Sequence, residues 1–174
     1  TQWSVGQKPY GLSLTVDHNL LVACSGATKI QEYTTVGSLV RELLLQSISS
    51  PYTAVQLSND RYGITHTGPY QGCSIVDGSG KLIKSYGDPS TVGPGHVKLK
   101  WPDCLAVNKR GFVFIADNSS VGLVLIDPST FTAKQLNIDG GFGNLWSVCI
   151  DESRGRLYIG EWTSGGRVIV LGKN

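Results

Sequence analysis

Four copies of one strand pattern constrain this sequence more than any other feature. Apolar segments begin at residues 9, 51, 102 and 145, and each is followed by two more short apolar strands. We call these four first segments the heads of the repeats. The four heads are 42, 51 and 43 residues apart. That spacing is typical of a β-propeller, in which one blade takes ~40–50 residues. The sequence therefore predicts an all-β protein, a β-propeller built of four blades.

The stretch from Trp101 to Asp127 shows the pattern most clearly. Its three apolar strands are separated by a Lys-Arg-Gly turn and by a loop of small residues. We expect four-stranded blades, because the first three copies also offer outer strands at residues 39–43, 81–86 and 132–136. The repeats span about residues 9–47, 51–87, 102–137 and 145–174 of a single propeller domain, and the Pro- and Gly-rich residues 88–96 form an irregular loop.

The two ends of the chain leave the number of blades open. The last copy stops after its third strand, and Trp3-Ser4-Val5 has no partner in its own repeat. Residues 1–7 either supply the missing outer strand of the last blade and close a ring, or are the tail of a preceding blade. Propellers have four to eight blades, so a closed four-blade ring and part of a six-blade ring both fit. A chain without Met favours a processed product or a domain of a longer protein.

The heads and second strands resemble the NHL repeat. The matching segments are Pro9–Leu12, Leu105–Val107, Phe114–Asp117 and Lys29–Tyr33. The resemblance covers nearly the whole chain and is greatest to the C-terminal propeller of tripartite-motif proteins that carry NHL repeats. It implies a six-bladed platform that binds a protein substrate or RNA. Ubiquitin-ligase activity is not implied, because the sequence shows no RING, B-box or coiled coil.

Turns between first and second strands carry cations in the last three repeats, and such turns share one face of a propeller. With Lys81 from an outer turn, the candidate binding residues are Arg61, Lys81, Lys109, Arg110, Arg154 and Arg156. A basic face could bind phosphates of single-stranded RNA or acidic groups of a protein partner. The alternative is a set of ordinary solvated turns, because Asp60, Asp151 and Glu152 lie among these cations.

The ends of the second strands form a second set of equivalent positions. They are occupied by Cys24, His66, Asp117 and Glu161, all residue types that bind metals. A metal-dependent hydrolase is therefore an alternative function. We favour a structural role, in which Asp117 accepts hydrogen bonds from backbone donors of the loop that follows it. We accordingly expect no metal and no cofactor.

Aromatic residues suggest a further surface. Tyr70 and Trp162 follow second strands in loops rich in Gly, and both are candidates to bind a ligand on the face opposite the basic turns. We expect Trp101 and Trp146 to pack between blades. A secreted glycan-binding or matrix propeller is thus another alternative. The sequon Asn118-Ser119-Ser120 has meaning only in a secreted protein, so the compartment stays open.

The remaining composition mainly excludes functions. The net charge of +2 does not require nucleic acid as a partner, and no apolar run approaches the ~20 residues of a membrane span. No Ser-His-Asp set and no Gly-x-Ser-x-Gly motif occurs. The prediction is a non-enzymatic binding platform for a protein or single-stranded RNA, with oligomerisation as a route to a complete ring.

The four cysteines are spread widely and form no Cys-x-x-Cys pair. Their even number permits two disulfides in any of three pairings, but a chain of 174 residues does not need them. We expect free, buried thiols at Cys24, Cys73, Cys104 and Cys149.

Overall fold

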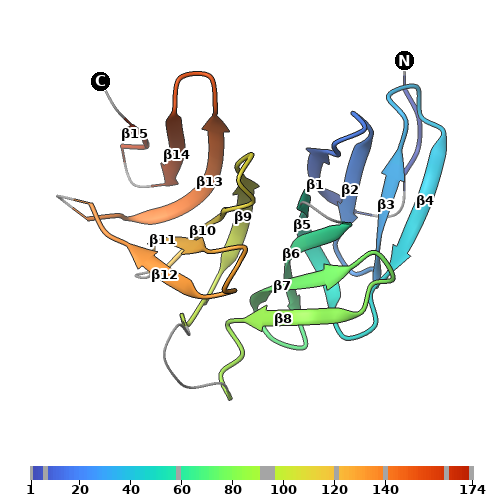
Figure 1. Ribbon diagram of the computed structural model, residues 1–174, viewed down its shortest axis with the longest axis horizontal. Helices are drawn as coiled ribbons and strands as arrows, with labels where there is room; N and C mark the ends of the chain where they lie inside the picture. Colours follow the sequence, from blue (N-terminus) through green and yellow to red (C-terminus); the bar gives the residue numbers. More distant parts are fainter. Residues whose placement is uncertain are drawn as a thin grey trace. The chain divides into compact units, whose positions relative to one another are not determined.

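The structure is a computed structural model, and it describes residues 2–5, 8–57, 60–90, 97–119, 122–138, 141–162 and 165–172. These residues contain fifteen strands and no helix (Figure 1). The chain divides into two compact units, residues 1–85 and 86–174. Each unit is described by itself.

The first unit contains two four-stranded antiparallel sheets. Blade 1 consists of β1 (Pro9–Leu14), β2 (Leu20–Cys24), β3 (Lys29–Tyr33) and β4 (Leu39–Leu44). Blade 2 consists of β5 (Ser49–Leu57), β6 (Arg61–Gly68), β7 (Gly72–Asp77) and β8 (Leu82–Tyr86). In both sheets the strands lie in chain order, as they do in a propeller blade.

The second unit repeats this arrangement with one strand fewer. Blade 3 consists of β9 (Pro102–Val107), β10 (Val113–Asp117), β11 (Gly122–Ile126) and β12 (Ala133–Leu136). Blade 4 consists of β13 (Asn144–Asp151), β14 (Arg156–Trp162) and β15 (Arg167–Gly172), and it has three strands among the described residues. The predicted fold class is confirmed: the chain is all-β, and its four sheets are propeller blades. The expected loop 88–96 has no strand at 88–90, and its remaining residues lie outside the described part.

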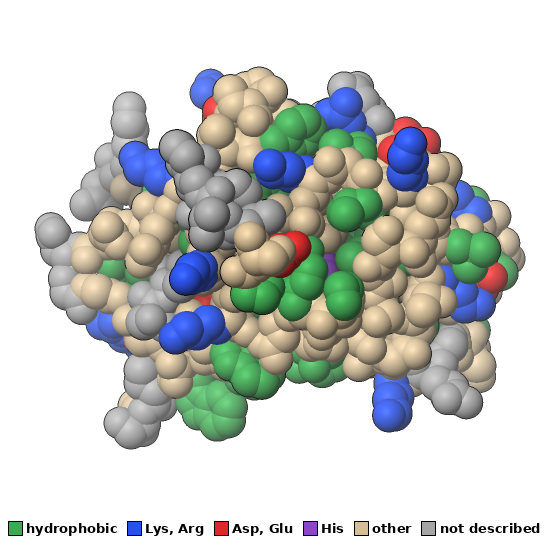
Figure 2. Space-filling view, turned by 90° about the horizontal axis from the view of Figure 1, so that it is seen from below, with side chains coloured by type: hydrophobic (Ala, Val, Ile, Leu, Met, Phe, Trp, Pro, Cys, Tyr) green, Lys and Arg blue, Asp and Glu red, His purple; other side chains and the backbone are tan. Residues whose placement is uncertain are grey.

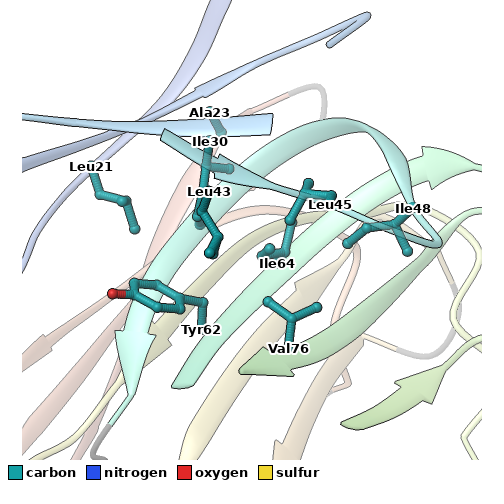
Figure 3. Close-up of a cluster of buried hydrophobic side chains, with 10 residues drawn as sticks. Leu21, Ala23, Ile30, Leu43, Leu45, Ile48, Tyr62, Ile64 and Val76 are labelled. Atoms are coloured by element: carbon teal, nitrogen blue, oxygen red, sulfur yellow. The ribbon is translucent and has the colours of Figure 1, made fainter. Parts of the chain in front are cut away.

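The core of the first unit lies between blades 1 and 2. Side chains of β2, β3 and β4 meet side chains of β5, β6 and β7 in one buried cluster (Figure 3). Leu21, Ala23 and Ile30 contribute from blade 1, while Tyr62 and Ile64 contribute from blade 2. The inner strands are covered on both faces, which explains why β2 is almost continuously apolar instead of alternating. β6 is covered in the same way but includes the buried polar residues Thr65 and His66.

The core of the second unit has the same construction. Ala116 and Leu123 of blade 3 pack with Leu145, Val148 and Ile159 of blade 4 in a single buried cluster. Each unit is therefore a pair of blades held together by apolar side chains. Burial of this kind contributes about 25 cal/mol for each Å² of apolar surface removed from water.

A polar network adds to the blade 1–blade 2 contact. Arg41 of β4 donates to the buried carboxylate of Glu32 at 2.8 Å, and its guanidinium lies 3.6 Å from Asp60. The same guanidinium donates to the Tyr62 hydroxyl and stacks over that ring, 5.4 Å from its centroid. Burial raises the pKa of Tyr62 to about 12. Arg41 thus links the outer strand of one blade to the first hairpin of the next.

The turns before the outer strands β8 and β12 are organised by Asp residues. Asp77 accepts hydrogen bonds from the backbone N–H groups of Ser79 at 2.8 Å and Lys81 at 3.1 Å. Asp127 accepts one from Ser129 at 2.8 Å. The hydrogen bonds from Ser79 and Ser129 are the main reason that the pKa values of Asp77 and Asp127 lie below the usual value.

The N-terminal segment belongs to the first unit. Residues 2–5 form no strand, and Trp3 and Val5 pack against Val22, Cys24 and Tyr33 of blade 1. A β-carbon at Gly37 would lie 2.7 Å from the Trp3 ring, so the β3–β4 turn approaches this segment closely. The structure therefore places residues 2–5 against blade 1, and their predicted role as a closing strand stays a prediction. Residues 1, 6 and 7 lie outside the described part.

Candidate functional site

Blade 4 carries two exposed tryptophans in contact with each other. Trp146 of β13 is 43% exposed and Trp162 of β14 is 64% exposed. Their rings meet edge to face, with centroids 5.1 Å apart and an interplanar angle of 80°. Aromatic pairs favour this geometry, and such large side chains are rarely left in water without a partner.

A β-bulge explains the position of Trp146. Leu145 pairs with Glu161 and Ser147 pairs with Gly160, so Trp146 is the extra residue of β13 and has no pairing partner in β14. Sequence reasoning did not identify this exposed pair, because a bulge cannot be recognised from strand alternation. Trp101 is also 53% exposed, and the expected packing of Trp101 and Trp146 between blades stays a prediction.

The tryptophan pair borders an open cavity of about 590 Å³. Its lining residues are Trp146, Gly160, Glu161, Trp162, Gly166, Arg167 and Val168. Gly160 contributes no side chain to the cavity, and the lining is mostly apolar because it consists largely of Trp146, Trp162 and Val168. The cavity has the size of a small-ligand pocket, but it is open along one side of the sheet, as a docking surface for a larger partner is.

Glu161 and Arg167 form the polar part of this cavity. The Glu161 side chain is fully buried, and it accepts hydrogen bonds from the Arg167 guanidinium and from the backbone N–H of Gly143. The hydrogen bond from Arg167 is the main reason that the pKa of Glu161 lies below its usual value. Both carboxylate oxygens are engaged, so Glu161 anchors Arg167 at the rim.

The predicted basic residues of the second unit come from two turns that touch. The backbone N–H of Lys109 donates to Glu152 at 2.6 Å, which joins the β9–β10 turn to the β13–β14 turn. Lys109 and Arg110 are exposed, while Arg154 is paired with Asp151 at 2.8 Å. Arg156 stands opposite Asp151 in the β13–β14 register. This surface therefore alternates in charge.

The predicted basic residues of the first unit also lie beside carboxylates. Arg61 stands opposite Asp77 in the β6–β7 register. Lys81 donates its backbone N–H to the same carboxylate, as described above. The face drawn in Figure 2 likewise shows Lys and Arg side chains spread among polar, apolar and acidic groups rather than gathered in one patch.

Cations and exposed tryptophans lie at opposite ends of the last sheet. Arg156 begins β14 and Trp162 ends it, and their partners in β13 are Asp151 and Asn144. Six residue steps along a strand separate the two ends by roughly 20 Å. No single ligand group can contact both the Lys109–Arg110 turn and the tryptophan pair.

The four metal-ligand candidates have separate local roles. Asp117 accepts hydrogen bonds from the backbone N–H groups of Lys100 at 2.8 Å and Trp101 at 3.2 Å, and from the Ser119 hydroxyl. Asp117 is therefore a backbone anchor, as predicted, but its backbone donors precede β9 instead of following β10. Burial raises its pKa. Burial is also the main cause of the raised pKa of Cys24.

His66 and Tyr70 form a buried contact in blade 2. The Nε2 atom of His66 lies 2.8 Å from the Ser74 hydroxyl, and burial lowers the pKa of His66 to about 4. The Tyr70 ring packs edge-on against His66 at a centroid distance of 5.5 Å. Tyr70 is half-buried, so it supports the histidine, whereas Trp162 is freely exposed. Among the described residues, no group of three or more His, Cys, Asp and Glu is placed to share a metal ion.

All four cysteines are free thiols. Cys24 and Cys73 are buried, and burial raises the pKa of Cys73 to about 12. Cys104 is partly exposed and Cys149 is exposed, so the predicted burial was wrong for these two. In the sequon, Ser120 lies outside the described residues. The described residues include no helix long and apolar enough to span a membrane.

No protein-family model and no curated protein matches this sequence. Solved structures do match its fold. A protein of unknown function from Bacteroides caccae is similar with a TM-score of 0.73 and 16% identity, over 99% of this chain and 66% of that one. A chain of a nidogen/laminin complex is similar with a TM-score of 0.72 and 15% identity, over 94% of this chain and 60% of that one. The chain thus spans about two thirds of the length of the propellers it resembles, and identities this low show the fold alone.

Proposed function

We propose that this chain is a non-enzymatic protein-binding module, and that the surface around Trp146 and Trp162 is its contact with a partner. The observation that supports it is an exposed tryptophan pair beside an arginine held rigid by a buried carboxylate. Trp and Arg dominate the energetics of protein interfaces, because they bury a large area and keep a polar group for the rim. The resemblance to the NHL repeat agrees with a binding role.

The same geometry favours protein over single-stranded RNA. Sites for single-stranded RNA combine cations that follow the backbone with aromatic rings that stack on the bases. Here Lys109 and Arg110 lie in the β9–β10 turn of blade 3, which contacts the β13–β14 turn at one end of the last sheet, and the tryptophans lie at the other end of that sheet. The turn surface also carries Asp151 and Glu152, which repel phosphates.

A glycan is favoured less than a protein. Glycan sites combine an aromatic platform with polar groups that are free to bond hydroxyls. In this cavity Glu161 already uses both of its oxygens on Arg167 and Gly143. The rest of the lining is aromatic, aliphatic or glycine. An apolar partner surface matches that lining.

Site-specific photo-crosslinking tests the proposal. The photoreactive residue p-benzoylphenylalanine is placed at Trp162 in one variant and at Arg110 in another, and each protein is irradiated in extract of cells that express it. We expect a protein adduct from position 162 that survives ribonuclease. Trp146→Ala in the same protein should lower its yield about tenfold, the effect of losing one interface hot spot.

The position-110 variant is the matched control, since it carries the probe on an exposed turn of the same unit. Adducts that form only from position 110 and disappear with ribonuclease would replace the protein-binding proposal with an RNA-binding one. Equal yields with and without Trp146 would also contradict the proposal.

A further inference from the structure

Blades pack on one another through equivalent positions in both units. In blade 1, Ala23 and Ile30 are paired across β2 and β3 and belong to the core shared with blade 2. In blade 3, Ala116 and Leu123 are paired across β10 and β11 and belong to the core shared with blade 4. We call this side of a blade its forward side.

The blade that follows uses a different pair of positions. In blade 2, Ala54 and Ile64 are paired across β5 and β6 and face blade 1. In blade 4, Val148 and Ile159 are paired across β13 and β14 and face blade 3. We call this side the backward side. Each blade contact in the structure is thus a forward side against a backward side.

Blade 4 presents a forward side that no described residue of its own unit covers. Gly160 and Val168 are paired across β14 and β15 at the register of Ala23 and Ile30. Val168 is 68% exposed and Val170 is 50% exposed. Trp146 and Trp162 border the same surface, so the candidate binding site and this forward side are one surface.

Blade 1 presents the complementary backward side. Leu12 and Val22 are paired across β1 and β2 at the register of Ala54 and Ile64. Leu12 is 67% exposed and Leu14 is 61% exposed, although Trp3 and Val5 pack over Val22. A cavity of about 370 Å³ lies beside Leu12 and Leu20. This surface is apolar along β1 and β2, whereas its β3 and β4 part carries Gln31, which pairs with Val22 and donates to Glu42.

In both units a first-strand side chain of one blade contacts an equivalent backbone carbonyl of the next blade, although the two donors hold different register positions. The Ser13 hydroxyl donates to the Ala54 carbonyl at 2.7 Å, and the Cys104 thiol lies 3.8 Å from the Val148 carbonyl as a weak donor. Ala54 and Val148 hold the register position of Leu12. The Leu12 carbonyl is therefore at the position that accepts a bond from the forward side of a preceding blade.

The aromatic residues follow the same rule. Tyr10 of blade 1 stacks on Tyr52 of blade 2, with centroids 4.5 Å apart. Both tyrosines are the bulge residues of their head strands, between Pro9 and Gly11 and between Pro51 and Thr53, and Trp146 holds the corresponding place in blade 4. Trp146 is therefore an aromatic residue of a blade contact whose other half is absent from its own unit.

We propose that the forward side of blade 4 binds the backward side of blade 1 on a second copy of this chain. The proposal rests on the proposed function and names the partner of the same tryptophan surface. A second copy carries the matched face, because the two surfaces are the two halves of a contact that the chain already forms twice. Such a head-to-tail contact is heterologous, so each copy uses two different surfaces.

Complementation between two variants tests it. Leu12→Glu places a charge on the backward side, and Val168→Glu places one on the forward side. In sedimentation equilibrium at up to about 100 µM, a range that detects micromolar contacts, the unmodified chain should self-associate and each variant alone should be monomeric. An equimolar mixture of the two variants should form a one-to-one dimer, because one intact forward side then meets one intact backward side.

Val36→Glu is the control, since Val36 is 71% exposed in the β3–β4 turn and lies on neither side. It should associate as the unmodified chain does, and circular dichroism should show that all three variants fold. A monomeric unmodified chain, unchanged association of either interface variant, or a mixture that stays monomeric would overturn the proposal. If the chain is monomeric but position 162 still crosslinks another protein, the proposed function stands and only the identity of the partner fails.

Discussion

At the scale of single residues, one equivalent position near the end of each second strand is occupied by four different residue types, and each side chain has a different local role. Asp117 holds backbone N–H groups, Glu161 holds an arginine, His66 is bonded to Ser74, and Cys24 is packed beneath the N-terminal segment. Sequence reasoning identified the position and the anchoring role of Asp117, since short acidic side chains commonly bond nearby backbone. It could not identify the donors, because they come from residues before the preceding strand.

His66 should make stability depend on pH. Its folded pKa of about 4 lies below its ordinary value of 6.5, so the unfolded state binds the proton more readily. The contribution of the neutral histidine to the free energy of unfolding is complete above about pH 6.5 and is lost as the pH falls through about 4. The loss should approach 3 kcal/mol, because each pKa unit corresponds to about 1.4 kcal/mol. Urea unfolding at several pH values measures it.

His66→Gln isolates this effect from the titration of carboxylates over the same range. The difference in unfolding free energy between the two proteins should shrink steadily as the solution is acidified. A constant difference at all pH values would mean that His66 does not titrate with a lowered pKa, and the account of its burial would be wrong.

At the scale of strands, the sequence was informative wherever burial imposes a pattern. The predicted second and third strands agree closely with β2, β3 and β10. All three are largely buried, and β2 and β10 read as apolar runs, whereas β3 contains Gln31 and Glu32. β5 begins at Ser49, two residues before the predicted head. The bulges near the starts of β1, β5 and β13 were not predictable, since an extra residue changes the pairing without changing composition.

The contact between β4 and blade 2 should depend on Arg41. Replacing it by Met leaves the Glu32 carboxylate, 5% exposed, with Asn19 but without a cation. Removing one partner of a buried ion pair costs roughly 3–5 kcal/mol, but the Arg41 side chain is 40% exposed and its charge is partly screened. Arg41→Met should therefore lower the free energy of unfolding by roughly 2–4 kcal/mol in urea near neutral pH. Adding Glu32→Gln should recover part of the loss.

Lys134→Met is a suitable comparison, because Lys134 is exposed on an outer strand of blade 3. It should change the unfolding free energy by less than about 0.5 kcal/mol, as surface substitutions usually do. A similar small effect of Arg41→Met would show that the network does not hold the two blades together.

At the scale of the whole molecule, repetition predicted the class of fold but not the binding surface. Four heads at regular spacing were enough to indicate a propeller, because each blade needs the next to bury its apolar face. The basic turns looked like the main candidate in the sequence, since charge is visible there and pairing is not. In the structure Asp151 and Glu152 lie among those cations, and the exposed tryptophan pair lies on blade 4.

Two double variants test most directly whether the tryptophan surface is the binding surface. Trp146→Ala with Trp162→Ala removes the aromatic pair, and Lys109→Ala with Arg110→Ala removes the exposed cations at the other end of the sheet. We expect the first pair to weaken self-association in sedimentation equilibrium by about a hundredfold, the effect of two interface hot spots, and the second to leave it within about threefold. The opposite result, with association lost from the basic pair and kept by the tryptophan pair, would contradict the account.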